Sequence, residues 1–558
     1  MPSIRIQNMG GISPRLSDRL ISQASATIAQ NCKLGSGEIR PYRSARLDAA
    51  PLKTGFIESI HNINGFWLSW NGDVDVVRGF VPNDTTGRFY YTGDGKPKVS
   101  NISLATSMQP YPSFGYDLGV PAPTTRLTAT LGVGGSGTPV PVVYVFTSVT
   151  SFEEESPPSP VSVAINVPPG ATVQLSNIAP SVQANVNRTR IYRTSVGTST
   201  TEYLFVAEIP SNQPTFTDNV REIDLKERLI STEWAPPPNN MIGIISHPNS
   251  FLAGFVGNQL ILSEQNQLHA FPKKYVRSFD FPIVALGIYG STIVVATTGF
   301  IYLVSGTDPR AMSVERLPDP YPCVSKRSLV SADRGVIFAS NEGLVWVGYG
   351  GLQIISRDVM SRDDWQKYNP SSMHGISYDG KYIGFYLTDG GRDYTLFDPV
   401  GQGFIFDYND RATGVDQKDK LTTLDFYPTA AYANPDTNFF FVKREQRKNN
   451  LYEWEAGSLF LPFVWKSKAF IMPYLTSFGA AKVVCRNRKT TSGKTVKINI
   501  YVADKLVFTR FVITNEPFRL SRFYRAVDPW YVEVIGTEDV QEIHLATSVE
   551  ELKEGKSQ

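Results

Sequence analysis

A repeat of turn-broken apolar runs between residues 241 and 455 is the feature that most constrains how this chain can fold. Five times, an apolar run stops at a turn and a second apolar run follows it. The runs are rich in β-branched and aromatic residues and end at turn pairs such as Asp379-Gly380, which indicates strands joined by hairpins. The five units start at Ile242, Ile283, Ser328, Met373 and Thr429.

The spacing of these units predicts the fold. The first four starts are about 41–45 residues apart, which is the range at which four-stranded propeller blades recur. None of the units has the long 3.6-residue periodicity of a helix. We therefore predict an all-β chain with a β-propeller over residues 239–460.

Composition agrees with a sheet protein of several domains. The chain has 558 residues, so two to four domains are expected. Its 26 Tyr and 32 Phe against 8 Met suit sheets better than helical bundles. The formal net charge of +2 gives no argument for a nucleic-acid or membrane partner of the whole chain.

The cysteine content and the hydropathy of the sequence further limit the class of protein to which this chain can belong. Cys32, Cys323 and Cys485 are odd in number and far apart, so we expect buried free thiols and neither a disulfide framework nor a zinc site. The first residues lack the apolar core of a signal peptide, and no apolar run of about 18 residues occurs. We expect a soluble chain made in a cytosol, without membrane insertion or a cofactor.

The N-terminal residues predict a helix and a further piece of propeller. Ser17-Asp18 resembles an N-cap, and apolar residues from Leu16 to Ile28 fall on one helical face, so residues 1–54 are expected to be a helix ending near Asn31, followed by an arm. Residues 55–119 again look like a blade. Together with the five later units they predict about six blades, closed by segments from both ends of the chain.

Residues 120–238 interrupt this pattern. They begin with VPAPTT and end with WAPPPNN, which are Pro-rich borders of the kind that separate domains. About seven short alternating strands lie between them, as in an immunoglobulin-like sandwich, and the SFEEESPPSP segment resembles the fibronectin type III variant. Residues 461–558 predict a C-terminal β domain with a charged tail.

Motifs for catalysis do not assemble in the sequence. There is no GxSxG elbow, and the five histidines are dispersed without an HExxH pair. Two carboxylate pairs, Asp363-Asp364 and Asp389 with Asp393, could serve acid–base chemistry on a sugar, but no second acid is placed opposite them. We predict a protein that is not an enzyme, with no catalytic, cofactor-binding or metal residues.

Two basic clusters are the candidate contact residues. The ordinary interpretation of such clusters is a solubilising loop. In a ring around DNA they would instead touch backbone phosphates without reading sequence. The candidates facing DNA or a partner are Lys443, Arg444, Arg447 and Lys448 in one loop and Arg486, Arg488 and Lys489 in another.

Four stretches of the chain resemble the tail nozzle or hub proteins of short-tailed bacteriophages, the tail tubular protein B type. The first is GGISPRLSDRLI with AQNCKLGSGEIRPYRS, and the second is LGVPAPTT with STEWAPPPNNMIGIISHPNSFLAGFVGNQLILSE. The third is YPCVSKRSLVSADRGVIFASNEGLVWVG, and the fourth is FRLSRFYRAVDPWYVEVIGTEDVQEIHLATSVEEL. The fibronectin-like insertion departs from the simplest nozzles.

The resemblance implies a structural virion protein of the phage tail, assembled in the host cytoplasm. Copies of it would form a homohexameric ring below the portal-adaptor protein, channel and retain double-stranded DNA without sequence specificity, and anchor tail fibres or spikes. Two other classes stay open. One is a glycan-active propeller hydrolase, and the other is a polysaccharide-binding adhesin.

Overall fold

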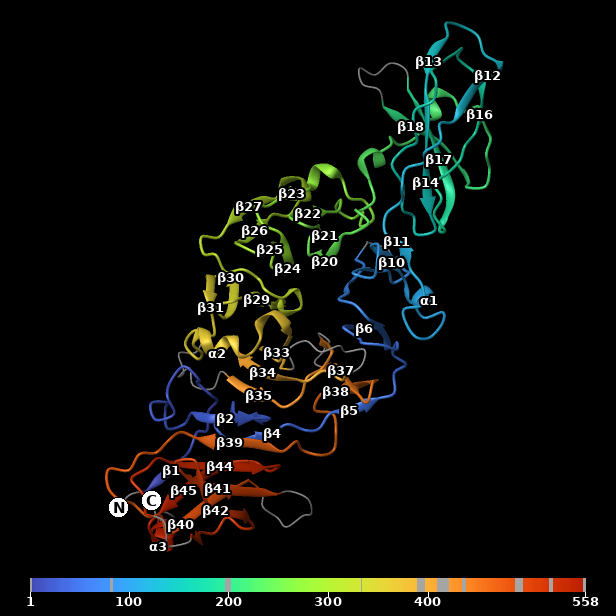
Figure 1. Cartoon of the computed structure of the whole chain (residues 1–558). Helices are drawn as coiled ribbons and strands as arrows, with labels where there is room; N and C mark the ends of the chain where they lie inside the picture. Colours follow the sequence, from blue (N-terminus) through green and yellow to red (C-terminus); the bar gives the residue numbers. More distant parts are fainter. Residues whose placement is uncertain are drawn as a thin grey trace. The chain divides into compact units, whose positions relative to one another are not determined.

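The computed structural model describes residues 3–80, 84–195, 202–332, 334–388, 397–408, 421–433, 438–486, 495–520 and 525–554. Almost all regular structure in these ranges is β-strand (Figure 1). The chain divides into two compact units. Unit 1 comprises residues 1–71, 299–301 and 317–558, and unit 2 comprises residues 72–298 and 302–316.

Each of the five repeats predicted from the sequence contributes antiparallel strands to a sheet, four from each of the first four repeats and three from the fifth. Two of these sheets, and a third built from residues 75–117, belong to unit 2. The sheet from residues 75–117 contains β8 (Asp75–Arg78), β9 (Phe89–Thr92), β10 (Lys98–Ser100) and β11 (Tyr116–Asp117). The first repeat forms β20 (Ile242–His247), β21 (Phe251–Val256), β22 (Gln259–Leu262) and β23 (Arg277–Ser278). The second repeat forms β24 (Ile283–Tyr289), β25 (Thr292–Thr297), β26 (Ile301–Ser305) and β27 (Ser313–Arg316). The first strands β8, β20 and β24 contact one another in sequence order.

Unit 1 holds the other three repeats. The third repeat forms β28 (Val330–Ala332), β29 (Gly335–Ala339), β30 (Leu344–Gly348) and β31 (Gly351–Ile354). The fourth forms β32 (His374–Tyr378), β33 (Lys381–Leu387), β34 (Gly401–Asp407) and β35 (Leu421–Leu424). The fifth forms β36 (Ala430–Ala433), β37 (Phe439–Glu445) and β38 (Lys448–Glu453), and β5 (Arg46–Asp48) completes its sheet. The predicted turn Asp379-Gly380 closes β32 onto β33, with positive φ at both residues as a type I′ turn requires.

Residues 55–119 form two sheets and not the single blade that their sequence predicts. β6 (Ser59–Ile63) and β7 (Phe66–Trp70) pair with each other in unit 1, whereas β8 to β11 form their own sheet in unit 2. β6 contacts β36, so the first strands β28, β32, β36 and β6 of unit 1 also follow one another. A short helix, α1 (Ile102–Ala105), lies between β10 and β11.

The prediction of a helix near residues 17–31 is wrong. Residues 26–30 are instead the strand β2 (Ala26–Gln30), and no helix occurs in the described residues 3–54. β2 lies between β35 and β39 (Phe463–Ser467), with Gln30 opposite Thr423 on one side and Ala29 opposite Trp465 on the other. Partners this distant in sequence override the local helical periodicity.

The strand β2 joins the repeats to the C-terminal region in one nine-stranded sheet. Its order is β32-β33-β34-β35-β2-β39-β44-β41-β42, where β44 is Trp530–Gly536, β41 is Val496–Val502 and β42 is Lys505–Val512. A second sheet has the order β1-β45-β40-β43, with β1 (Ile4–Ile6), β45 (Val540–Ala546), β40 (Ala480–Cys485) and β43 (Phe518–Arg519). Unit 1 also contains β3 (Cys32–Lys33), β4 (Arg40–Pro41), α2 (Arg362–Gln366) and α3 (Val549–Glu554).

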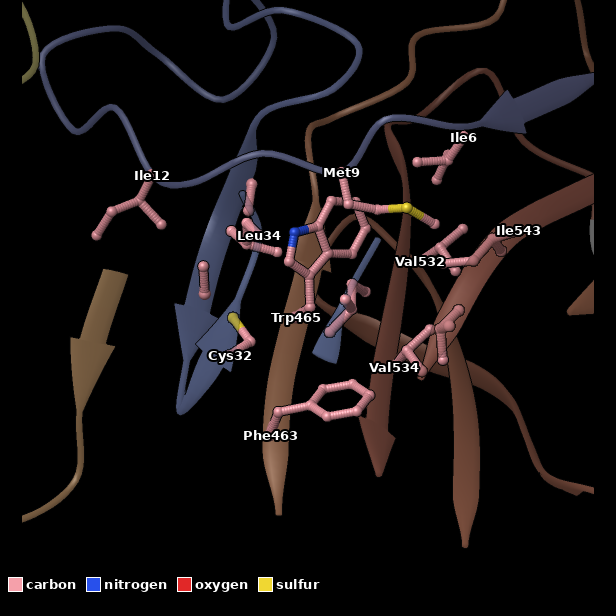
Figure 2. Packing of buried hydrophobic residues seen from close by; sticks show 14 of the residues in the cluster. Ile6, Met9, Ile12, Cys32, Leu34, Phe463, Trp465, Val532, Val534 and Ile543 are labelled. Atoms are coloured by element: carbon pink, nitrogen blue, oxygen red, sulfur yellow. The ribbon is translucent and has the colours of Figure 1, made fainter. Parts of the chain in front are cut away.

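One hydrophobic core holds the two ends of the chain together. Figure 2 shows Trp465 among Met9, Leu34 and Phe463, all of them buried. The same core contains Ile4, Ile6 and Ile12 from the N-terminal segment and Val532, Val534 and Ile543 from the C-terminal strands. The N-terminal segment is therefore part of the C-terminal core and not a separate arm.

The described residues of the insertion contain eight strands. β12 (Thr128–Gly134), β16 (Ala171–Ser176) and β19 (Phe216–Asp218) form one sheet, β14 (Tyr144–Thr150), β17 (Val186–Thr194) and β18 (Tyr203–Pro210) form another, and β13 (Val140–Val142) pairs with β15 (Ile165–Val167). Side chains from both three-stranded sheets share one core, which includes Tyr144, Phe146, Val173 and Ile191.

A serine–proline segment covers the open edge of β14. Ser156, Ser159 and Ser162 recur every third residue, and the backbone N–H of each donates to a carbonyl of β14. The Oγ of each serine in turn accepts from the N–H of Ser148, Phe146 or Tyr144, at 2.8–3.1 Å. Prolines cannot donate to a ladder, so the serine hydroxyls complete the hydrogen bonding of the edge strand.

Candidate functional site

The first predicted basic cluster lies on the hairpin of β37 and β38. The Lys443 Nζ is 2.8 Å from the Glu445 carboxylate, so its charge is compensated on the same strand. The Arg444 side chain is buried, 5.8 Å from the ring centre of Phe56, with its Nε 3.8 Å from Asp398. The prediction that Arg444 faces DNA or a partner is therefore wrong, because alternation along β37 turns this residue inward.

The tip of the same hairpin does face solvent. Gln446 and Arg447 both have positive φ, and their backbone N–H groups donate to the Asp398 carboxylate at 2.7 and 3.0 Å. This carboxylate holds the two-residue turn, as short acidic side chains commonly do. The side chains of Arg447 and Lys448 are exposed and can reach an external anion.

The second predicted cluster is described only at Arg486. Its Nη2 lies 2.9 Å from Glu38, which also accepts from Gln541 at 2.8 Å. Burial acts to raise the pKa of Glu38, but the hydrogen bonds from Gln541 and Arg486 lower it overall, so this carboxylate stays ionised. Arg488 and Lys489 lie outside the described residues.

Of the two predicted carboxylate pairs, the structure describes Asp363-Asp364, which stabilises a helix. Asp364 in the first turn of α2 accepts from Ser361 at 2.6 Å and pairs with Lys367 at 2.8 Å. Ser361 is the N-cap of α2, and the acidic side chains of Asp363 and Asp364 lie in its first turn, where negative charge stabilises a helix. Asp389 and Asp393 lie outside the described residues.

The histidines are dispersed in the structure as they are in the sequence. His269 is buried, its Nε2 lies 3.1 Å from the Glu155 carbonyl, and burial lowers its pKa to about 4. Burial also lowers the pKa of His374 and of His247. Neutral buried imidazoles of this kind pack and orient neighbouring groups.

The three cysteines are free and buried. Burial raises the pKa of the Cys32 thiol and that of Cys323, the latter to about 12. Within the described ranges, no group of three or more His, Cys, Asp or Glu residues could hold a metal ion. Nor is any helix found there long and apolar enough to cross a membrane.

Unit 2 contains a buried cluster of charged side chains that are not among the site residues predicted from the sequence. Arg88 binds Asp84 at 3.1 Å and the Phe152 carbonyl at 2.9 Å, and its Nη1 lies 3.6 Å from Glu154. Glu154 is 2% exposed, and burial raises its pKa to about 7 although Arg88 opposes the shift. In the sequence, the run of three glutamates at Glu153–Glu155, next to Phe152, is the feature that could have indicated this cluster.

Asp84 is the closer of the two charge partners of Arg88. The pKa of Asp84 is about 2: burial acts to raise it, but hydrogen bonds from Thr86 and Arg88 outweigh burial. The contact of Arg88 with Glu154 is longer than a hydrogen bond. Arg88 therefore pairs closely with Asp84, whereas Glu154, with a pKa of about 7, is only partly ionised at pH 7.

Comparison with known proteins gives no family for this chain. No family model and no curated protein matches it. Among solved structures, that of PorZ, a surface component of the type-IX secretion system of Porphyromonas gingivalis, is 10% identical with a TM-score of 0.19, over 73% of this chain and 52% of PorZ. A chain in the S. cerevisiae complex of dbp5 with nup159, gle1, ip6 and adp is 11% identical with a TM-score of 0.23, over 75% of this chain and 98% of that one.

These similarities carry no argument about fold or function, because both TM-scores are far below 0.5. The chain spans about half the length of the PorZ structure that it matches.

Proposed function

We propose that this chain is a structural component of a short phage tail, in which six copies form a nozzle or hub ring. The proposal starts from the sequence resemblance of four stretches to tail nozzle proteins. The structural observation that supports it best is the nine-stranded sheet, in which β2 connects the repeats to the C-terminal strands. A sheet that ties both ends of the chain together resists deformation, because neighbouring ladders must break together before the ends separate.

In this proposal the repeated sheets are the blades of a propeller. Six sets of four antiparallel strands follow the chain, and β6 with β7 adds a two-stranded sheet. Within each unit the first strands of successive sheets contact one another, which is how blades pack around an axis. The insertion is then an immunoglobulin or fibronectin III-like sandwich that presents a side surface to another protein.

The proposed partners follow from the ring. Identical chains related by rotation make head-to-tail interfaces that close on themselves. The portal-adaptor protein would bind above the ring, tail fibres or spikes outside it, and double-stranded DNA would pass through it without sequence-specific contacts. Arg447 and Lys448 are the predicted basic residues whose exposed side chains suit phosphate contacts.

The test is electron cryo-microscopy of the particles that contain this chain, combined with native mass spectrometry of the purified protein mixed with its portal-adaptor. We expect a six-fold ring of this chain at the tail and a complex with six copies. Particles whose tail lacks the chain, or a chain that stays monomeric in them, would contradict the proposal. Release of reducing sugar from host polysaccharide by the pure protein would favour the hydrolase alternative.

A further inference from the structure

A cleft of about 860 Å³ opens within unit 2, where the end of the insertion meets loops of the first and second repeats. One wall carries Glu202, Arg228 and Glu233 from the insertion and its exit segment. The other wall carries Glu264, Lys274 and Arg310 from the loops of the repeats. Its volume lies in the range of about 300–1,000 Å³ that small-ligand sites occupy.

The charges of this cleft cancel one another in pairs. Arg228 lies 3.5 Å from Glu202, Arg310 lies 3.1 Å from Glu264, and Lys274 pairs with Glu233 across the two walls. Three acids and three bases leave no net charge among these six residues. A phosphate or an acidic polymer would find no excess of positive charge here, and a cation would find no excess of carboxylates.

The rest of the lining combines the apolar side chains of Leu229, Ile230 and Trp234 with neutral hydrogen-bonding groups. Three amides in a row, Gln265, Asn266 and Gln267, and the hydroxyl of Thr232 face the cleft. Paired carboxylates and guanidinium groups make strong hydrogen bonds to neutral hydroxyls, and amides both donate and accept. An apolar ligand would leave these groups without partners, at a cost of about 1–3 kcal/mol for each buried group.

Contacts beneath the cleft hold its two walls in place. The Phe271 N–H donates to the Ala235 carbonyl at 2.7 Å, and the rings of Trp234 and His269 meet edge to face at 5.5 Å between centres. His269 also bonds the Glu155 carbonyl. Tyr275 is buried and donates to Glu264 at 2.7 Å, so this carboxylate is positioned from behind while Arg310 holds it from the solvent side. A cleft formed in advance costs less ordering when a ligand binds.

We propose that this cleft binds a short neutral oligosaccharide, whose hydroxyls bridge the paired charges and the adjacent amides. The assignment does not depend on the place of the chain in a virion. The carboxylates are engaged by Arg, Lys or Tyr partners, and the proposal is for binding alone. The cleft is a recognition site on the side of the insertion.

The test uses the full chain and isothermal titration with neutral trisaccharides of glucose, galactose, mannose and N-acetylglucosamine. Trigalacturonic acid and inorganic phosphate are the charged comparison probes. We expect saturable binding of at least one neutral sugar, at least tenfold weaker in Arg310→Ala and in Gln267→Ala. Arg221→Ala is the matched control, because this exposed arginine pairs with Asp224 outside the cleft, and its affinity should stay within twofold of the unchanged protein.

Three results would overturn the proposal. The first is that none of the neutral sugars binds. The second is that trigalacturonic acid or phosphate binds as tightly, with the same dependence on Arg310. The third is that both cleft variants, folded as judged by unchanged thermal midpoints, keep full affinity. Because the test reads sugar binding alone, its failure would leave the proposed tail function untouched.

Discussion

The indole N–H of Trp465 donates a hydrogen bond of 3.0 Å to the carbonyl of Gly10, a residue 455 positions earlier in the chain. Trp465 lies in the core where N-terminal residues pack against the C-terminal strands (Figure 2), and Gly10 is buried as well. This bond ties the segment before β2 to β39, the strand that pairs with β2. The two ends of the chain therefore depend on each other for their fold.

Trp465→Phe tests this dependence. The substitution keeps an aromatic ring but removes the donor to Gly10, so we expect the free energy of unfolding to fall by about 1–3 kcal/mol. Urea denaturation measures the change. Trp530→Phe is the matched control, because Trp530 is also buried but its indole N–H has no hydrogen-bond partner in the described part of the chain. Equal losses in the two variants would show that the bond to Gly10 contributes nothing.

Glu154 makes the stability of unit 2 depend on pH. Its folded pKa of about 7 lies above the value of an exposed glutamate, so its contribution to stability is complete below about pH 4.5 and is lost as pH rises through 7. We expect Glu154→Gln to gain stability relative to the unchanged protein between pH 5 and 8, by up to about 3 kcal/mol. Urea titrations across this range check the difference, and parallel pH profiles of the two proteins would refute it.

The serine–proline segment is expected to stabilise the insertion through its hydroxyls. Ser159→Ala leaves the buried N–H of Phe146 without its acceptor, so we expect a loss of about 1–3 kcal/mol in the free energy of unfolding. Ser231→Ala is the control, since the buried Oγ of Ser231 makes no hydrogen bond within the described residues and its removal should cost little. The idea fails if the Ser159 variant is as stable as the control.

The hairpin tip of β37 and β38 offers a test of DNA contact. If Arg447 and Lys448 each neutralise a phosphate, replacing both with Gln should lower the slope of log affinity against log salt by about 2 for each bound hairpin. Fluorescence anisotropy with a labelled DNA duplex measures this slope. Arg221→Gln, an exposed arginine in unit 2, serves as the control. An unchanged slope in the double variant would remove these residues from the DNA-contact proposal.

Local features of the fold were predictable from the sequence. Each repeat forms hairpins whose partners are only a few residues apart, and Asp379-Gly380 marks its turn because both residues tolerate positive φ. The strands of the insertion were predictable from alternation alone, because their partners, such as β16 for β12 and β17 for β14, are distant in the sequence. The predicted all-β character is confirmed, and the propeller remains a prediction.

The side chains of the candidate site were less predictable. Arg444 stands in a run of basic residues that looks like a solvent-facing loop, but the pleat of β37 turns it toward Phe56. The charge cluster of Arg88 and Glu154 joins residues 66 positions apart, and only the packing of unit 2 reveals that Glu154 is buried. The sequence specifies which side chains carry a charge, whereas the burial of each side chain depends on neighbours that are distant along the chain.

The sequence alone therefore determined strand content and the period of the repeats, because hydrogen bonding to near neighbours depends on local residue order. Only the tertiary structure decided that residues 26–30 form a strand, since their helical periodicity is overridden by pairing with residues such as Thr423, which donates to Ala29 from 394 positions away. Alternation and turns specify where strands lie, but the partner of a strand is chosen by burial of both its faces in the folded chain.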